Sequence, residues 1–251
     1  MPSSAPPHLN TRLLAIAAAA AVVLLAGCAV NKLHTASELA KASEPLQHPV
    51  EKPLARLLIV GDSTAVGTGA SAPQTSLAGL LARAYPGLLI ENRGRDGATF
   101  AEIPSQLERD NARFDVVLVL AGGNDVIRLR DLDVTPLHLQ KIAELAKARS
   151  KQVVFMPAGN VGNAPFFFPP VSWWMSSRAR AMHTLVRQAA EQQGADYVNL
   201  YKDRSDDPFA QRKELNAKDG LHPSDAGYQV WFEELMTQSG LAQQLAAAKP
   251  A

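Results

Sequence analysis

The feature that most constrains the fold is a repeated alternation between short apolar runs and longer amphipathic stretches, which begins near residue 56. The apolar runs are nearly continuous, as expected for strands that are buried on both faces. Buried strands separated by helices form a parallel sheet with helices on both sides. We therefore predict an α/β fold of three layers, α/β/α, around a central parallel sheet, with strands at residues 56–61, 88–92, 115–121, 152–157 and 197–201.

Helical patterns fill the intervals between these runs. Pro136 stands where a proline suits the first turn of a helix. The chain has 251 residues and a hydrophobic fraction of 47%, which suits one sizeable core. We predict one catalytic domain over residues 56–251, with helices at 75–85, 99–109, 135–149 and 177–193 and a last helix that starts near Ser224.

The charge balance excludes one class of partner. The chain carries 25 lysine and arginine residues against 24 acidic residues. Such a balance produces no long-range field that would attract nucleic acid or an anionic membrane surface. We therefore expect no nucleic-acid partner.

The N-terminal segment differs from the rest of the chain. Residues 13–26 are an unbroken apolar run preceded by Arg12 and followed by Gly27. A membrane-spanning helix usually needs about 20 apolar residues, and this run is shorter and ends in small residues that suit cleavage. The pattern favours an export signal over residues 1–27, with a membrane-spanning helix as the alternative.

Cys28 is the only cysteine in the chain. The sequence Leu25-Ala26-Gly27-Cys28 resembles the lipobox of bacterial lipoproteins, which implies removal of the signal before Cys28 and attachment of lipid to it. The alternative is a small apolar residue beside an ordinary cleavage site. Because Ala29 follows, the resemblance implies a lipoprotein at the periplasmic face of the outer membrane, with the polar, proline-bearing residues 28–55 as a tether that includes a short helix at 35–43.

Residues able to carry chemistry follow the predicted strands. Gly61-Asp62-Ser63 follows the first strand, Gly97 lies after the second, and a Gly-Gly-Asn-Asp run ending at Asp125 follows the third. In open parallel sheets, ligands bind beyond the carboxyl ends of the strands. We therefore expect these segments to meet at one site.

A serine needs a base and an orienting carboxylate before it acts as a nucleophile. Asp219 and His222 offer both groups within one loop, so Ser63 is the candidate nucleophile. Hydrolysis also needs donors aimed at the oxyanion of the tetrahedral intermediate. The candidates are the backbone N–H groups of Ser63 and Gly97 and the side-chain amide of Asn124.

Together these segments resemble, in order, the four signature blocks of the SGNH or GDSL hydrolases, and the resemblance covers residues 56–241. It implies a flavodoxin-like fold, with Ser63 as nucleophile, His222 as general base, Asp219 as its orienting carboxylate, and Ser63, Gly97 and Asn124 as the oxyanion hole. The sequence departs from the family at Thr64, where the name-giving tetrapeptide has leucine.

Other catalytic motifs are missing from the sequence. Ser63 lacks the Gly-x-Ser-x-Gly elbow of the α/β-hydrolases. The glycines after the first strand have neither the Lys-Ser/Thr of a phosphate loop nor dinucleotide spacing. The six histidines show no metal-ligand spacing. We therefore expect no cofactor and no metal.

Residues 160–175 contain a run of phenylalanines, the adjacent prolines Pro169-Pro170 and the pair Trp173-Trp174. Two adjacent prolines predict that this segment is not a regular helix. We identify Phe167, Trp173 and Trp174, together with Asp62, as candidate substrate-binding residues. Two alternatives are that the aromatics contact the membrane that holds Cys28, or that they pack as a local hydrophobic plug.

The chain is accordingly predicted to be a serine ester hydrolase of the esterase or lipase type that acts through an acyl-enzyme. The same machinery suits an acyltransferase or a carbohydrate or peptidoglycan O-acetyl esterase. A third alternative is an exported lipoprotein that binds lipid or glycan without turnover. The expected substrate is an acyl ester of a small molecule, lipid or glycan, and no motif specifies acyl length or oligomeric state.

Overall fold

The computed structural model describes residues 8–249, and within the first helix the side chains of residues 8–12, 18, 20–26, 28 and 29 lie outside this description. The start of the predicted export signal and the side chain of Cys28, the predicted lipidation site, therefore fall outside the described part.

Five parallel strands form one sheet in the order β2-β1-β3-β4-β5. Its register pairs Ile59 with Asn92 on one side and with Leu118 on the other. The predicted α/β fold with a central parallel sheet is confirmed. The strands are β1 (Ala55–Gly61), β2 (Leu88–Asn92), β3 (Phe114–Leu120), β4 (Ser150–Phe155) and β5 (Asp196–Tyr197).

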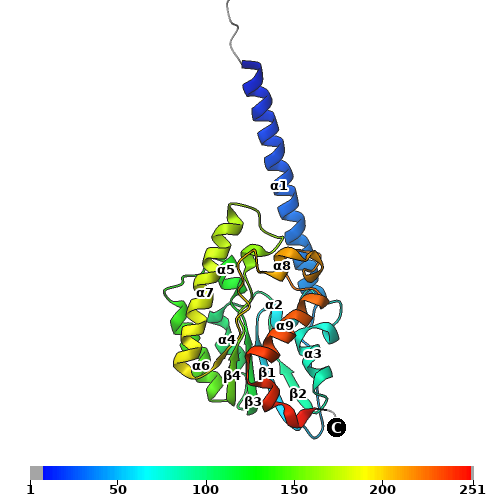
Figure 1. The fold of residues 1–251 in the computed structure, drawn as a ribbon, viewed down its shortest axis with the longest axis vertical. Coiled ribbons are helices and arrows are strands. Elements are labelled where there is room, and N and C mark those ends of the chain that lie inside the picture. The colour runs from blue at the N-terminus through cyan, green and yellow to red at the C-terminus, as the bar shows by residue number, and fades with distance from the viewer. Residues whose placement is uncertain (1–7, 250–251) are drawn as a thin grey trace, which may run out of the picture.

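Both faces of the sheet are covered by helices, as Figure 1 shows. Leu57 and Ile59 of β1 belong to one hydrophobic cluster, which includes residues of α3 (Leu77–Ala84), α9 (Asp225–Gln238) and α10 (Leu241–Gln244). Leu58 and Val60 belong to a second cluster, because successive side chains of a strand point to opposite faces. The helices over this face are α4 (Ile103–Leu107), α6 (Thr135–Lys147) and α7 (Val171–Gln193).

Several elements differ from the predicted bounds. In the stretch predicted as a helix at 99–109 the α-helix is only Ile103–Leu107, and the short helix predicted at 35–43 is the end of a longer helix, α1 (His8–Ala42). Helix α7 begins at Val171, six residues before the predicted start, so the last five residues of the 160–175 segment are helical, although its adjacent prolines predicted no regular helix there. Pro170 stands at the N-cap, where a missing N–H removes no helical hydrogen bond. Strand β5 is shorter than predicted because the N–H of Asn199 bonds to the side chain of Gln238 instead of a neighbouring strand.

The segment before β1 has two parts. Helix α1 (His8–Ala42) projects from the domain at the end where α5 (Gly123–Ile127) and α8 (Pro208–Gln211) lie (Figure 1). Among the described residues, no helix combines the length and apolarity needed to cross a membrane. After α1, the chain runs along the free edge of β2, where the His48 N–H donates to the Ile90 carbonyl at 3.0 Å.

The strand order places the loops that carry the candidate site. The chain passes from β1 to β2 on one side and then crosses back to β3 on the other side of β1. This reversal creates a crevice between the loops that follow β1 and β3. The short helix α2 (Ser63–Val66) and helix α5 begin in these two loops.

Candidate active site

Ser63 is the first residue of α2, separated from the end of β1 only by Asp62. Asp62 is the N-cap and accepts a hydrogen bond at 2.9 Å from the Thr64 N–H. The first N–H groups of a helix have no partner inside it, so the Ser63 N–H is directed outward from the helix start. The turn needs glycine at Gly61, where φ is +154° and a Cβ would lie 1.9 Å from the Leu120 carbonyl oxygen.

Asp219, His222 and Ser63 form a continuous hydrogen-bonded chain. His222 Nε2 lies 3.0 Å from Ser63 Oγ, and His222 Nδ1 lies 2.6 Å from Asp219 Oδ2. An ionised carboxylate only accepts hydrogen bonds, so Nδ1 donates and Nε2 presents its lone pair to the serine hydroxyl. This is the tautomer that a general base requires.

The loop between Asp219 and His222 fixes the carboxylate by its own backbone. Asp219 Oδ1 accepts the N–H groups of Leu221 at 2.9 Å and His222 at 3.1 Å. Burial raises the pKa of Asp219, but the hydrogen bond and the charge of His222 together with these N–H groups outweigh it, so the net pKa lies below its ordinary value. The carboxylate is therefore held in its ionised form.

Asp62, next to Ser63 in the chain, and Asp125 are two further carboxyl groups, and both are almost fully buried. Burial raises the pKa of Asp62 to about 6, although hydrogen bonds from Thr64 lower it. Burial also raises the pKa of Asp125 to about 6, and the nearby Asp62 adds to the shift. Asp62 is 1% exposed and Asp125 3% exposed, so neither group is solvated when it ionises.

Two hydrogen bonds join the loops that carry the candidate oxyanion donors. Asn124 Nδ2 donates to the Ala98 carbonyl at 3.2 Å, and Asp125 accepts the Phe100 N–H at 3.1 Å. Gly97 has φ of +75°, and a Cβ there would lie 2.6 Å from a guanidinium nitrogen of Arg128. The loop after β3 is thus tied to the loop after β2 beside Gly97.

A small cavity of about 50 Å³ opens at the serine. Ser63, His222, Asn124 and Asp62 line it, together with Ile127 and other apolar residues. The cavity therefore combines the nucleophile, its base and one candidate oxyanion donor. Gly97 is not among the lining residues.

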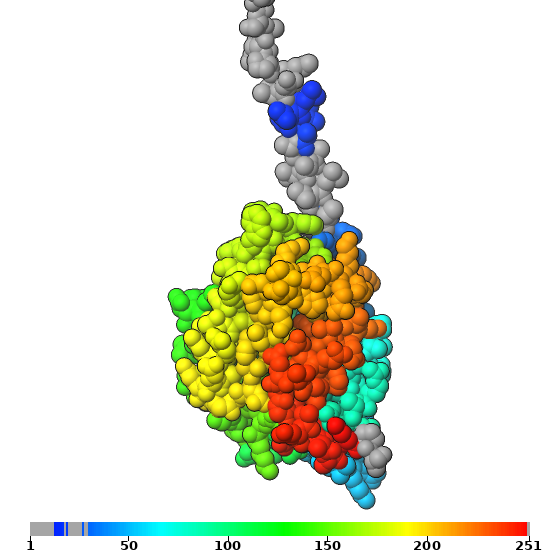
Figure 2. Space-filling view, viewed as in Figure 1, coloured from blue at the N-terminus to red at the C-terminus, as the bar shows by residue number. Residues whose placement is uncertain are grey.

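The other candidate substrate-binding residues lie outside this cavity. Phe167 is half-buried and packs against the core on the α7 side of the sheet. Trp173 is 69% exposed and Trp174 51% exposed, at the start of α7. Their role in substrate binding stays a prediction. Figure 2 shows this part of the chain at the end of the domain from which α1 leaves.

His183 is a buried residue that sequence reasoning missed. Its Nε2 lies 2.8 Å from the Ala158 carbonyl and its Nδ1 lies 2.7 Å from the Tyr197 hydroxyl. Burial lowers the pKa of His183 to about 4, so the ring is neutral at physiological pH. Because Ala158 lines the cavity at the serine, His183 supports its wall from behind. An isolated histidine inside a helical pattern gives no signal of this role.

The N-terminal helix reaches the aromatic segment, which we define as residues 166–174. Lys32 Nζ donates to the carbonyl groups of Pro165 and Phe166, and it lies 4.2 Å from the centre of the Phe168 ring.

Among the described residues, no group of three or more histidine, cysteine, aspartate or glutamate side chains is placed to hold a metal ion.

We compared the chain with protein families and with known proteins. The sequence profile of the GDSL-like lipase/acylhydrolase family matches residues 59–230. No curated protein sequence matches the chain.

Solved structures similar to this chain share its fold. The acetylxylan esterase Axe2 from Geobacillus stearothermophilus is 23% identical, with a TM-score of 0.53 over 77% of this chain and 94% of that chain. An extracellular lipase from Streptomyces rimosus is 18% identical, with a TM-score of 0.57 over 74% of this chain and 100% of the lipase. TesA is 21% identical, with a TM-score of 0.57 over 76% of this chain and 99% of TesA.

Proposed function

Because the chain belongs to the GDSL-like lipase/acylhydrolase family and is a carboxylic ester hydrolase, we propose that Ser63 is its nucleophile, with His222 as general base and Asp219 as the orienting carboxylate. The observation that carries this proposal is the hydrogen-bonded chain from Asp219 Oδ2 through both ring nitrogens of His222 to Ser63 Oγ.

The chemistry follows from this geometry. Ser63 Oγ attacks the ester carbonyl carbon while its proton passes to His222 Nε2, and the buried Asp219 carboxylate stabilises the resulting imidazolium. The carbonyl oxygen becomes an oxyanion that receives hydrogen bonds from the Ser63 N–H, the Gly97 N–H and the Asn124 amide. His222 then gives its proton to the leaving alkoxide, and the acyl group stays on Ser63.

Deacylation repeats the sequence with water. His222 takes a proton from a water molecule that attacks the acyl-enzyme, and returns it to Ser63 Oγ as the acid leaves. The proton that Ser63 loses leaves with the alcohol and is replaced by one from the water molecule, so His222 is neutral again after each half of the reaction.

Substitution of the nucleophile tests the proposal. We expect Ser63→Ala to lower kcat for 4-nitrophenyl acetate by at least about 10⁴-fold, and to abolish labelling by a fluorophosphonate. Ser205→Ala is the matched control, because Ser205 is an exposed serine of the same domain. Labelling or turnover that survives in Ser63→Ala would overturn the assignment.

A second variant tests the role of the carboxylate. Asp219→Asn replaces an acceptor of the His222 Nδ1 proton by a side chain that also donates, which favours the wrong tautomer. We expect a loss in kcat of about 10⁴-fold with little change in KM. An Asp219→Asn variant within tenfold of the wild-type kcat would contradict the role of Asp219.

We also propose that the chain is exported and anchored by lipid on Cys28. The apolar run at residues 13–26 and the sequence Leu25-Ala26-Gly27-Cys28 support this, and Cys28 is the only cysteine available. Intact mass of the protein purified from bacterial membranes should show a chain that begins at Cys28 and carries diacylglycerol. Cys28→Ser should remove the lipid, and an unmodified wild-type protein would overturn the proposal.

A further inference from the structure

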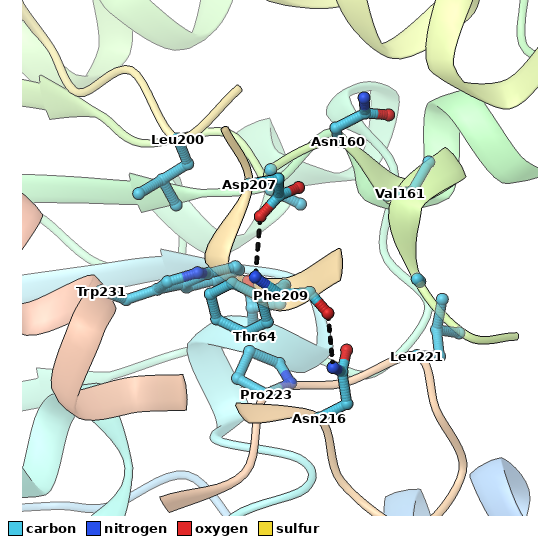
Figure 3. Close-up of a pocket in the computed structure, with 13 residues that line it drawn as sticks. Thr64, Asn160, Val161, Leu200, Asp207, Phe209, Asn216, Leu221, Pro223 and Trp231 are labelled. Carbon is cyan, nitrogen blue, oxygen red and sulfur yellow. Dashed lines mark hydrogen bonds between the residues drawn. The ribbon is translucent and has the colours of Figure 1, made fainter. Parts of the chain in front are cut away.

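A second cavity adjoins the one at Ser63. Its volume is about 70 Å³, and four of its lining residues also line the cavity at the serine. Figure 3 shows Thr64 and Leu221 among the residues around this space. The shared residues are Thr64, Ala158, Val161 and Leu221.

The far wall of this cavity is apolar. Trp231 from α9 and Phe209 from α8 stand side by side, with their ring centres 6.2 Å apart, and Leu200 lies near them (Figure 3). Trp231 is 6% exposed, so its ring belongs to the core and also bounds the cavity. The side chains that a ligand would meet here are aromatic and aliphatic.

The polar residues of the wall already have protein partners. Asp207 accepts hydrogen bonds from the Phe209 N–H at 2.9 Å and from Asn163 Nδ2 at 2.7 Å. Asn160 bonds to the Gly162 N–H and the Lys202 carbonyl, and Asn216 Nδ2 donates to the Phe209 carbonyl. Because these donors and acceptors already bond to the protein, few of them are left to bind a ligand.

Thr64 lines both cavities and is also the position where the sequence departs from the family tetrapeptide. Its hydroxyl donates to Asp62 Oδ1 at 2.8 Å. A threonine has fewer side-chain carbons than the leucine it replaces, and its one polar atom is engaged with Asp62. The passage beside Ser63 is therefore wider than a leucine would leave it.

We propose that the second cavity binds an aliphatic segment of the ester, which passes Thr64 to reach Phe209, Leu200 and Trp231. This inference rests on the proposed function, because it places the ester carbonyl at Ser63. Water-sized groups occupy about 10–15 Å³ of such volume each, so the cavity holds roughly five heavy atoms. The substrate class is accordingly an ester with a short aliphatic chain, of about butanoyl to hexanoyl length.

A series of 4-nitrophenyl esters measures the effect. For the wild-type protein, kcat/KM should rise about fourfold for each added methylene from acetyl to hexanoyl, and stop rising by decanoyl. A parallel series of alkyl acetates varies the alcohol at constant acyl length. A rise in either series supports binding of an aliphatic segment and identifies which part of the ester enters, and a flat profile in both overturns it.

Variants that fill or enlarge the cavity provide the sharper test. Ala164→Leu adds carbons to a wall residue that is 8% exposed, and should lower the ratio of hexanoyl to acetyl kcat/KM at least tenfold. Ala189→Leu is the matched control, since Ala189 is also 8% exposed but lines a separate cavity between α6 and α7. Leu200→Ala should shift the optimum to longer chains, which an unfolded protein does not show.

Restoring the family residue gives an independent readout. Thr64→Leu should lower the same hexanoyl to acetyl ratio by narrowing the passage. If acetate hydrolysis depends on Ser63 but Ala164→Leu and Thr64→Leu keep the wild-type ratio, the cavity proposal is wrong and the proposed function stands. If acetate hydrolysis does not depend on Ser63, the proposed function itself fails.

Discussion

The three tryptophans of this chain lie in two contrasting regions. Trp231 is 6% exposed and contacts Tyr228 and Phe209 beside the second cavity. Trp173 and Trp174 are more than half exposed in the aromatic segment. The conspicuous aromatic motif therefore lies on the surface, and a single tryptophan within an ordinary helical pattern bounds the cavity next to the serine.

The largest expected difference between the two regions is in stability. Trp231→Ala should lower the free energy of unfolding by about 3–5 kcal/mol, because it leaves a cavity in a packed core. Trp173→Ala should change it by no more than about 0.5 kcal/mol, because the side chain is exposed. Urea denaturation of both variants measures this, and equal losses would abolish the distinction.

The second expected difference is in how the free energy of unfolding depends on pH, and it compares the buried Asp62 with the exposed Asp203. The pKa of Asp62 is raised from 3.8 to about 6 by burial, so the folded protein retains a proton that the unfolded chain releases. The resulting stabilisation is full below pH 4 and is lost as pH rises through about 6. The loss amounts to about 3 kcal/mol of unfolding free energy in the wild-type protein. Asp62→Asn has no such titrating group, so its unfolding free energy should rise relative to that of wild type by this amount from pH 4 to pH 8.

The matched variant lies beside the aromatic segment. Asp203 pairs with Arg180 at 2.6 Å, but both side chains are more than half exposed. Water screens an exposed ion pair, so Asp203→Asn should change the free energy of unfolding by only a small amount. Unfolding free energies at several pH values measure both variants. A pH-independent difference for Asp62→Asn would contradict the buried environment of Asp62.

The smallest expected effect is spectroscopic and concerns contact with lipid. Lys32 lies four residues after Cys28 and contacts the aromatic segment, so at most about 14 Å of chain separates the proposed anchor from it. Tryptophan side chains favour the membrane interface. In vesicles that contain brominated lipid, the lipidated Trp231→Phe variant should show quenched fluorescence, because only Trp173 and Trp174 remain.

The complementary variant completes this comparison. A lipidated Trp173→Phe/Trp174→Phe protein retains only the buried Trp231, whose emission should be unaffected by the same vesicles. Equal quenching of the two proteins, or none in either, would contradict membrane contact through the aromatic segment.

The fold followed from the sequence because its signal is local and repeated. The continuous apolar runs correspond to β1 through β4 within one or two residues at either end. Strand β5 was less predictable, because Gln238 from a distant helix takes the N–H of Asn199. The start of α7 was also missed, since two prolines disfavour a helix that contains them but permit one that begins after them.

The sequence predicted the reacting residues of the candidate site but not the walls of the second cavity beside it. Ser63, Asp219 and His222 stand in motifs that follow the order of the family's signature blocks, and the structure brings their side chains within hydrogen-bonding distance. The walls of the second cavity carried no such signal. Trp231 fits the apolar face of any amphipathic helix, and Phe209 lies in a helix of four residues, too short to show such a pattern. Only the three-dimensional arrangement therefore distinguishes a cavity wall from ordinary core.

The short separation of Asp219 and His222 has a mechanical consequence. Base and carboxylate occupy one loop, and the N–H groups of that loop bind the carboxylate. If this loop moved, Asp219 and His222 would move together and keep the hydrogen bond between them, while the distance from His222 to Ser63 would change. The reactivity of Ser63 therefore depends on the position of this loop relative to the start of α2, which the 3.0 Å contact between His222 Nε2 and Ser63 Oγ reports.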